Sequence, residues 1–273
     1  MPNRTPVVFI HGFWLHASCW EPWIDRFSAC GFEPVAPGWP GEPDTVSEAR
    51  RRGEAVAVVG LDDVVHHYAR IVRSFDTEPV MVGHSIGGLI VQRLIGMNLG
   101  RSAVAIAAAP IKGVQLGSAF AHLCAKLPAF SDPDICARLP ELSAEQFRYV
   151  IANAVTEVES ACLFERYAIP SPGRTLFDAA YANSARNCRT SVRTDNATRG
   201  PLLLISGQED CLVPDAITRA VYKLYGDSRA VTELKQFVDR GHSMIIDGGW
   251  RAVADYTLTW LAHVGVSPSE QGC

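Results

Sequence analysis

The stretch VMVGHSIGG, residues 80–88, decides how the sequence is to be interpreted. Apolar residues run into Gly83, and Ser85 is flanked by glycines before a new apolar segment begins. One interpretation is a tight turn between a strand and a helix, which needs residues without a Cβ. The other is a Gly-x-Ser-x-Gly nucleophile elbow, in which a strained turn exposes the serine hydroxyl. The pattern is short enough to arise by chance, so the rest of the chain has to distinguish the two.

Segments with strand character alternate with segments of helical periodicity on both sides of this stretch. The predicted strands cover residues 6–10, 32–38, 79–84, 102–110, 201–206 and 230–238. The predicted helices include residues 61–75, 86–99, 214–225 and 250–263. Short, continuous apolar strands are buried on both faces, and their alternation with helices predicts an α/β fold with a doubly wound, mostly parallel sheet.

Two capping boxes predict further helix starts. Ser18 and Glu21 have the spacing of a capping box, which predicts a helix that runs to about Cys30. Thr45 and Glu48 repeat the pattern inside a loop rich in proline and glycine, so a short helix is expected there as well.

The alternation stops at Pro110 and resumes at Pro201. The segment between them contains helical patterns broken by prolines and no clear strand. We therefore expect residues 1–110 and 201–273 to form the α/β core, and residues 111–200 to be a helical insertion in it.

Three polar residues follow predicted strands in an order that suits nucleophilic catalysis. Ser85 follows strand 79–84, Asp210 follows strand 201–206, and His242 follows strand 230–238. A serine nucleophile needs a base to take its proton and an acid to orient that base. The order Ser, Asp, His predicts that Ser85 is the nucleophile, His242 the base and Asp210 the acid. Glu209 and Asp239 are rival acids, although Asp239 lies so near His242 in sequence that we interpret it as a loop carboxylate.

An oxyanion hole needs backbone N–H groups aimed at the developing negative charge. The N–H of Ile86, directly after the predicted nucleophile at a helix N-terminus, is one candidate. The N–H of Phe13, in the segment HGFW after the first strand, is the other. A simple strand-ending turn at His11-Gly12 is the alternative interpretation of that segment.

The segments FIHGFWLHASCW, VGHSIGG, SGQEDCLVP and RGHSM together resemble the α/β-hydrolase superfamily, in particular its esterase, lipase and cofactor-free haloperoxidase-like branch. The resemblance covers about residues 1–110 and 201–265. It implies the same catalytic roles for Ser85, His242 and Asp210, the same oxyanion donors, and a lid over Ser85 made by the insertion. It implies no metal and no organic cofactor.

One segment departs from the pattern of these relatives. In APGWPGEPDT, residues 36–45, Gly38 and Trp39 stand where relatives commonly carry an Asp before a turn similar to Arg-Gly-His-Gly. The departure leaves the predicted triad untouched but weakens any transfer of substrate class. Trp14 is a candidate for the wall of the acyl pocket, with core packing as the alternative.

Composition excludes several classes of protein. Hydrophobic residues make up 48% of the 273 residues, enough for a large core. The net charge of −4 shows no basic excess, which argues against nucleic acid as a partner. No stretch approaches the roughly 18 apolar residues that span a bilayer. The first residues lack the apolar region of a secretory signal, so we expect a cytoplasmic protein.

Other polar residues invite functional interpretations that we set aside. The eight cysteines show no C-x-x-C and no zinc-type spacing, so free thiols are expected. His66 and His67 are adjacent on a helix and point in different directions, which argues against a metal site. His84 and His11 are given structural roles. Asn196 begins a glycosylation sequon by pattern alone.

The sequence therefore predicts a serine hydrolase that cleaves an ester, lactone or thioester of a small apolar molecule through an acyl-enzyme. A second hypothesis keeps the triad for another reaction, such as peracid formation, C–C cleavage or a lyase step. A third is a non-catalytic protein that binds a small molecule on the same fold, and a fourth is an interaction scaffold. The oligomeric state and the natural substrate are left open.

Overall fold

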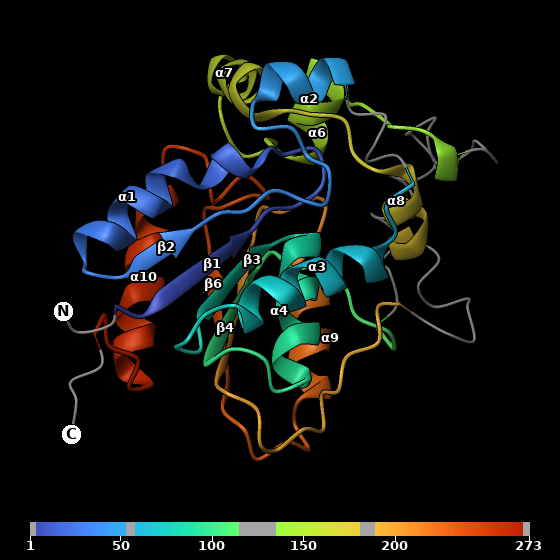
Figure 1. The fold of residues 1–273 in the computed structure, drawn as a ribbon. Helices are drawn as coiled ribbons and strands as arrows, with labels where there is room; N and C mark the ends of the chain where they lie inside the picture. The colour runs from blue at the N-terminus through green and yellow to red at the C-terminus, as the bar shows by residue number, and fades with distance from the viewer. Residues whose placement is uncertain (1–3, 53–57, 115–134, 181–188, 270–273) are drawn as a thin grey trace.

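A six-stranded parallel sheet forms the centre of the molecule (Figure 1). The computed structural model describes residues 4–52, 58–114, 135–180 and 189–269. In chain order the strands are β1 (Pro6–Ile10), β2 (Glu33–Val35), β3 (Val80–His84), β4 (Ser102–Ile106), β5 (Leu202–Gly207) and β6 (Thr232–Phe237). Their spatial order is β2-β1-β3-β4-β5-β6, and every pairing is parallel. The predicted α/β fold with a mostly parallel, doubly wound sheet is confirmed.

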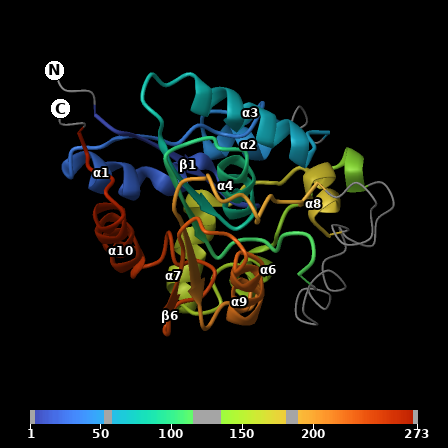
Figure 2. The same cartoon turned by 90° about the horizontal axis from the view of Figure 1, so that it is seen from below.

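Helices cover both faces of the sheet. In chain order the covering helices are α1 (Glu21–Ala29), α3 (Leu61–Arg73), α4 (Ile86–Gly96), α9 (Asp215–Leu224) and α10 (Trp250–His263), whereas α2 (Val46–Arg52) lies beyond the end of the strands (Figure 1). Helices α1 and α10 contact each other on one face, and α3 and α4 contact each other on the opposite face, as the view from below shows (Figure 2). Strands β1, β3, β4 and β5 are fully buried, as expected of strands covered on both faces.

Some predicted bounds were too long because local backbone geometry ends the elements early. Strand β4 stops at Ile106, since Ala107 adopts a left-handed conformation with φ 46°. The strand predicted at residues 32–38 is the shorter strand β2, which covers only Glu33–Val35. Helix α4 ends at Gly96, two residues before the left-handed Asn98 (φ 58°).

The capping box predicted at Ser18 and Glu21 is wrong. A 3₁₀ turn, η1 (Ala17–Trp20), comes first, and its N-cap is His16, whose ring accepts a hydrogen bond from Ser18 N. The α-helix then begins at Glu21 with proline in its first turn, a position that needs no N–H donor. The second box is correct: Thr45 Oγ1 accepts from Glu48 N and donates to the Glu48 carboxylate at the start of α2.

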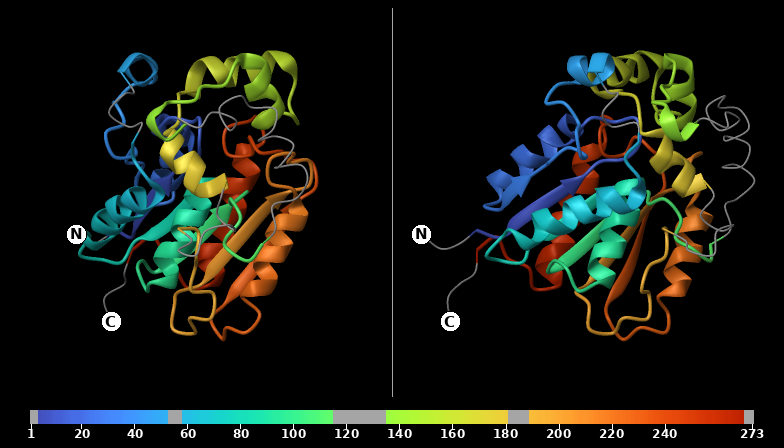
Figure 3. Two further views of the ribbon diagram at one scale, coloured as in Figure 1. Left: turned by 90° about the vertical axis from the view of Figure 1, so that its right-hand side faces the viewer. Right: turned by 45° about the vertical axis from the view of Figure 1, so that its right-hand side comes forward.

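Between β4 and β5, the described part of the chain contains helices and no strand. They are η4 (Ile135–Ala137), α6 (Ala144–Val150), α7 (Glu157–Tyr167) and α8 (Gly173–Ala180). Helices α6 and α7 lie beyond the edge of the sheet at which the strands end, together with α2 (Figures 1 and 3). Residues 115–134 and 181–188 of the predicted insertion lie outside the described residues.

The chain returns to β5 along helix α4 without forming a helix of its own between residues 189 and 200. Arg93 donates to the Arg189 carbonyl near the start of this return segment. Further along, Asn196 Nδ2 donates to Gly96 O (3.0 Å) and to Asn98 Oδ1 (2.7 Å). The asparagine of the sequon is thus buried and caps the C-terminus of α4.

The five cysteines within the described residues are free, as expected: Cys19, Cys30, Cys136, Cys162 and Cys211. Cys124, Cys188 and Cys273 lie outside those residues. None of the described helices is long and apolar enough to cross a membrane.

Candidate active site

The order of the strands creates a topological switch point at the carboxyl ends of the strands. The chain goes from β1 to β2 on one side and then returns to place β3 on the other side of β1. Loops that follow β1 and β3 therefore diverge, and such a switch point at the carboxyl ends of the strands is where α/β proteins bind ligands. Gly12 and Phe13 follow β1, and Ser85 follows β3, so the predicted oxyanion loop and nucleophile lie at this point.

Ser85 occupies the turn between β3 and α4 in a strained conformation. Its φ is 56° and its ψ is −119°, a combination that costs a residue with a Cβ about 1–3 kcal/mol. The backbone holds it there, because Ser85 N donates to Ile106 O (2.9 Å) and Ser85 O accepts from Ala109 N (2.9 Å). Strain maintained in this way is typical of functional positions.

The glycines of the opening motif are needed for close packing of the backbone. A Cβ on Gly83 would overlap the carbonyl oxygen of Gly87, and a Cβ on Gly87 would overlap the carbonyl oxygen of Ile10. Helix α4 therefore approaches β1 and β3 more closely than any residue with a side chain allows. The strand-to-helix turn and the strained serine occur together, so the two interpretations of the motif are compatible.

His242 and Asp210 form a buried pair next to this turn. His242 Nδ1 lies 2.8 Å from Asp210 Oδ2, and both side chains are fully buried. The other carboxylate oxygen, Oδ1, accepts from the N–H groups of Leu212 and Val213, each at 2.8 Å. The carboxylate is thus fixed from both sides. Because it can only accept from the imidazole, Nδ1 carries the hydrogen and Nε2 has a free lone pair.

His242 Nε2 is buried and has no hydrogen-bond partner among the described residues. In catalysis by a serine nucleophile, this nitrogen of the histidine accepts the proton of the serine hydroxyl. The hydrogen bond between the two groups is often long or poorly aligned in structures without substrate. His84, the residue before Ser85, links this turn to His242, because its Nε2–H donates to the carbonyl oxygen of His242 (2.9 Å). The rings of His84 and His242 lie 4.6 Å apart, centroid to centroid.

His84 is fully buried, and burial lowers its pKa well below the ordinary value of 6.5. The charge of His242 lowers it further, while the hydrogen bond to the His242 carbonyl opposes these effects. His84 is therefore neutral at pH 7, which agrees with the structural role expected for it.

The rival acids lie away from the imidazole of His242. Glu209 is exposed, and Asp239, also exposed, lies 3.3 Å from Arg240. Within the described residues, Asp210 is the carboxylate that contacts His242.

The two predicted oxyanion donors flank Ser85. Ile86 is the first residue of α4, so its N–H has no acceptor within the helix. Gly12 lies directly against the serine, since a Cβ on Gly12 would be 2.7 Å from Ser85 Cβ. The Gly12–Phe13 peptide is consequently next to Ser85, as a second donor must be.

A sequence model of one family covers almost the whole chain. The model, described as the alpha/beta hydrolase family, matches residues 7–256. The chain belongs to the alpha/beta hydrolase family. No curated protein sequence matches it.

Solved structures show how this hydrolase fold is shared. A protein from Mycobacterium tuberculosis described as a non-heme bromoperoxidase has a TM-score of 0.70 and 20% identity, with 97% of this chain and 94% of that chain covered. A methylesterase from Arabidopsis has a TM-score of 0.65 and 17% identity, with 95% and 99% covered. A monoacylglycerol lipase from Paleococcus ferrophilus has a TM-score of 0.60 and 20% identity, with 97% and 96% covered. At these identities the likeness establishes the fold.

Trp14 connects the loop after β1 of this alpha/beta hydrolase to the helical segment. Its backbone is left-handed (φ 60°), its N–H donates to Ser171 Oγ (2.6 Å), and its indole N–H donates to Pro140 O (3.2 Å). Ile169 N donates to Trp14 O (3.2 Å). Trp14 also lines a cavity of about 200 Å³ with residues of the helical segment, including Leu142 and Phe164. Contact with a substrate stays a prediction for this residue.

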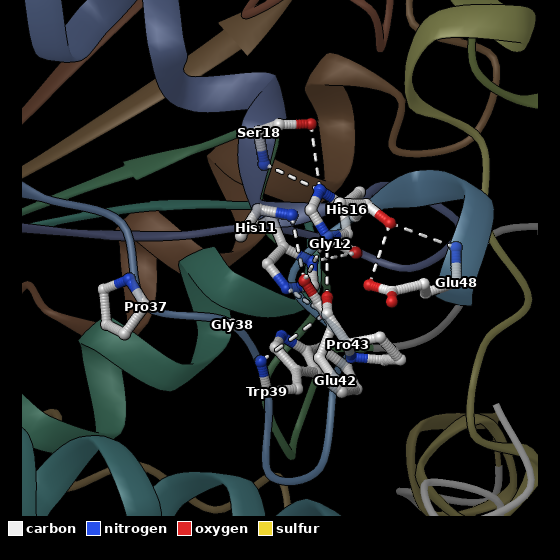
Figure 4. Close-up of polar contacts among 12 residues, drawn as sticks. His11, Gly12, His16, Ser18, Pro37, Gly38, Trp39, Glu42, Pro43 and Glu48 are labelled. Atoms are coloured by element: carbon white, nitrogen blue, oxygen red, sulfur yellow. Dashed lines mark hydrogen bonds and ion pairs between the residues drawn. The ribbon is translucent and has the colours of Figure 1, made fainter. Parts of the chain in front are cut away.

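A cluster around Glu42 was missed by the sequence analysis. Glu42 is buried beside the oxyanion loop, with Oε2 2.9 Å from His11 Nε2 and Oε1 3.6 Å from His16 Nε2 (Figure 4). Trp39 stacks on His11 with ring centroids 5.3 Å apart. The only sequence signal was the departure at residues 36–45, which supplies both Trp39 and Glu42. In the described part of the hydrolase, no group of three or more His, Cys, Asp or Glu side chains is arranged to hold a metal ion.

Proposed function

We propose that this alpha/beta hydrolase is a serine hydrolase that cleaves a carboxylic ester, lactone or thioester of a small apolar molecule through an acyl-enzyme. The observation that carries the proposal is the buried His242–Asp210 pair, 2.8 Å apart, beside the strained turn of Ser85. A carboxylate that fixes the tautomer of an imidazole next to a strained serine is the arrangement that nucleophilic acyl transfer requires.

In the proposed acylation step, Ser85 Oγ attacks the carbonyl carbon of the ester. His242 Nε2 takes the hydroxyl proton as the C–O bond forms, and Asp210 stabilises the resulting imidazolium. The oxygen of the tetrahedral intermediate receives hydrogen bonds from the N–H groups of Phe13 and Ile86. His242 then returns the proton to the leaving alkoxide or thiolate, which departs as the alcohol or thiol.

Deacylation repeats the sequence with water as the nucleophile. His242 Nε2 removes a proton from water as the water oxygen attacks the acyl carbon, and the second tetrahedral intermediate uses the same two N–H donors. The proton then passes to Ser85 Oγ, the acyl–serine bond breaks, and the carboxylic acid leaves. These steps use only the named groups and water.

The substrate class is supported by the neighbours and by the surroundings of the site. Two of the neighbours named above are a methylesterase and a monoacylglycerol lipase. A second cavity beside Gly12 is bordered mainly by apolar residues, among them Leu15, Ile169 and Pro170. We further propose that residues 111–200 are an insertion in a core of residues 1–110 and 201–273, and that the insertion covers the site as a lid. The position of α6 and α7 beyond the carboxyl ends of the strands supports this (Figure 3).

The test is hydrolysis of p-nitrophenyl esters with acyl chains from two to twelve carbons by the wild type, Ser85→Ala and His242→Ala. We expect turnover by the wild type and a loss of about 10³-fold or more in kcat for each variant. Labelling of the wild type by a fluorophosphonate, located at Ser85 by mass spectrometry and lost in Ser85→Ala, provides a second readout.

The control is Ser18→Ala, which removes a half-buried serine outside the proposed triad and should leave both readouts unchanged. A folded wild type without ester turnover and without labelling would rule out the serine mechanism. Labelling without ester turnover would instead favour another reaction of the same triad, such as peracid formation.

A further inference from the structure

The Glu42 cluster places a buried carboxylate behind the proposed oxyanion hole. The carboxylate has only 4% of its side chain exposed. Oε1 accepts from Ala17 N (3.0 Å), and Oε2 lies 3.5 Å from Trp39 N and 2.9 Å from His11 Nε2. Backbone donors on both oxygens favour the ionised form of the carboxylate. A buried charge of this kind needs a partner of opposite charge.

His11 has the geometry of that partner. Its Nδ1 makes a hydrogen bond of 2.9 Å with the carbonyl oxygen of Gly12, and its Nε2 makes an ion-pair contact of 2.9 Å with the carboxylate of Glu42 that lacks the alignment of a hydrogen bond. The carbonyl oxygen can only accept, so Nδ1 needs a hydrogen, and a bare lone pair on Nε2 at 2.9 Å from an ionised carboxylate would be repelled, so Nε2 needs one as well. Only the imidazolium form of His11 provides both.

The hydrogen bond from His11 controls the orientation of the next peptide. Gly12 O and the N–H of Phe13 belong to the same trans peptide unit and point in opposite directions. When His11 Nδ1–H holds Gly12 O, the Phe13 N–H is therefore fixed on the other side of the peptide. A positive charge on the carbonyl side also polarises the peptide, which makes the N–H a stronger donor.

We propose that Glu42 is a positioning residue for the oxyanion hole: its carboxylate keeps His11 as the imidazolium, which holds the Gly12–Phe13 peptide with its N–H facing the reacting carbonyl oxygen. The catalytic part of this inference rests on the proposed function, in which the Phe13 N–H is a donor. The part that concerns the proton on His11 is independent of it.

The other titratable groups around the pair are consistent with one positive and one negative charge. His16 also faces Glu42, and its ring nitrogens contact Ser18 N and Pro43 O as well. Burial raises the pKa of Cys19 and of Tyr68 well above their ordinary values, and Glu42 contributes to both. His84 is neutral for the reasons given above. Of the two histidines that face Glu42, His11 lies nearer to the carboxylate, at 2.9 Å against 3.6 Å for His16.

The pKa of Glu42 agrees with this assignment. Burial alone would raise it, but the charge of His11, the contact with His11, the charge of His16 and the N–H of Ala17 outweigh the effect of burial. The pKa of Glu42 consequently lies below its ordinary value of 4.5, so the carboxylate is ionised at neutral pH.

The first experiment is ¹⁵N NMR of the histidine side chains in the wild type, with His11 assigned by the loss of its signals in His11→Gln. At pH 7.5 we expect the His11 nitrogens to show the imidazolium pattern, with a proton on each. In Glu42→Gln we expect the His11 nitrogens to show the neutral pattern at the same pH. Neutral His11 in the wild type at pH 7.5 would overturn the inference whatever the result for Glu42→Gln.

The second experiment measures kcat and KM of the same proteins with p-nitrophenyl acetate from pH 6 to 9. For Glu42→Gln we expect kcat to fall about tenfold or more, with KM changed less than about threefold, because the affected donor acts mainly in the transition state. Glu48→Gln is the matched control, since it changes a nearby carboxylate at a position where glutamine also caps a helix.

The two arms separate the possible failures. A wild type without ester activity contradicts the proposed function, while the NMR arm still decides whether His11 carries the second proton. An active Glu42→Gln variant with unchanged kcat, together with a neutral His11, contradicts the positioning role. Retention of the imidazolium in Glu42→Gln contradicts the role of Glu42 as the group that maintains it.

Discussion

At the scale of single residues, Ser85 has its unusual backbone because neighbouring residues leave no alternative. Gly83 and Gly87 bring the backbones of β1, β3 and α4 together where a side chain has no room. The hydrogen bonds of Ser85 to Ile106 and Ala109 then hold the serine in its left-handed conformation. The close packing at Gly83 and Gly87 and the two hydrogen bonds of Ser85 offset the free energy that this strained conformation costs.

His84 is one residue through which pH affects stability near neutrality. Its folded-state pKa lies well below 6.5 because of burial, whereas in the unfolded chain it takes up a proton near pH 6.5. The unfolded state therefore binds more protons than the folded state below pH 6.5, and stability is lost as pH falls. We expect a loss of about 1.4 kcal/mol for each pH unit from this group below its unfolded pKa.

The measurement is the free energy of unfolding by urea between pH 7.5 and 5 for the wild type, His84→Gln and His66→Gln. Glutamine at position 84 can still donate to the His242 carbonyl but does not titrate, so the slope with pH should decrease in that variant. The exposed His66 serves as the control, and its variant should keep the slope of the wild type. Identical slopes in all three proteins would show that His84 does not carry the effect.

Single residues also show where prediction from sequence succeeds and where it stops. Asp210 and His242 could be proposed as a pair because each follows a strand, and parallel strands end at the same edge of a sheet. The structure places them in contact. The contact between His11 and Glu42 could not be derived, because it depends on how the loop at residues 36–45 folds back over the end of β1. No periodic pattern describes such a loop.

At the scale of elements, the start of α3 is stabilised by a residue of another helix. Asp178, in α8, accepts a hydrogen bond from Leu61 N (3.1 Å) at the N-terminus of α3. The same carboxylate pairs with Arg174 (3.2 Å) and with Arg189. An anion at a helix N-terminus is favourable because the N–H groups there have no partners within the helix.

We expect Asp178→Asn to lower the free energy of unfolding by about 1–3 kcal/mol. Asparagine can still accept from Leu61 N, but the two arginines lose their charged partner and the helix end loses its anion. Urea denaturation of the wild type, the variant and Asp25→Asn provides the measurement, with Asp25 an exposed carboxylate in α1. A loss in Asp178→Asn no larger than in the control would mean that the connection between α8 and α3 adds nothing to stability.

Elements with strong periodicity were predicted closely, and those set by local side-chain contacts were not. The closing helix was predicted at residues 250–263 and is α10 (Trp250–His263). The start of α1 was predicted wrongly because the ring of His16, rather than Ser18, accepts the capping hydrogen bond. A histidine cap is not a sequence signal, whereas the Thr45–Glu48 box is one and was predicted correctly.

At the scale of the whole molecule, the last part of the connection between β4 and β5 is an irregular segment, residues 189–200. Parallel neighbours require a crossover, and residues 189–200 run back along α4 without helical structure. Asn196 attaches this segment to the end of α4, because its Nδ2 donates to Gly96 O and to Asn98 Oδ1. The sequon asparagine is thus part of the architecture.

We expect Asn196→Ala to lower the free energy of unfolding by about 1–3 kcal/mol, since it leaves buried partners without a hydrogen bond. The neighbouring Asp195→Ala removes an exposed side chain and should change the free energy of unfolding by less than about 0.5 kcal/mol. Urea denaturation at pH 7.5 compares the two variants with the wild type. Equal effects in both variants would contradict the assigned role of Asn196.

The hydrogen bonds of Trp14 have a consequence for how the molecule moves. Trp14 binds Pro140, Ile169 and Ser171, and Leu15 pairs with Ala168, so the loop beside Ser85 and residues 140–171 are joined by several bonds. If residues 140–171 move away from the sheet, the hydrogen bonds to Trp14 have to break, and these bonds also hold Trp14 in its left-handed conformation. Any movement of residues 140–171 away from the sheet is therefore coupled to a rearrangement of the loop beside Ser85.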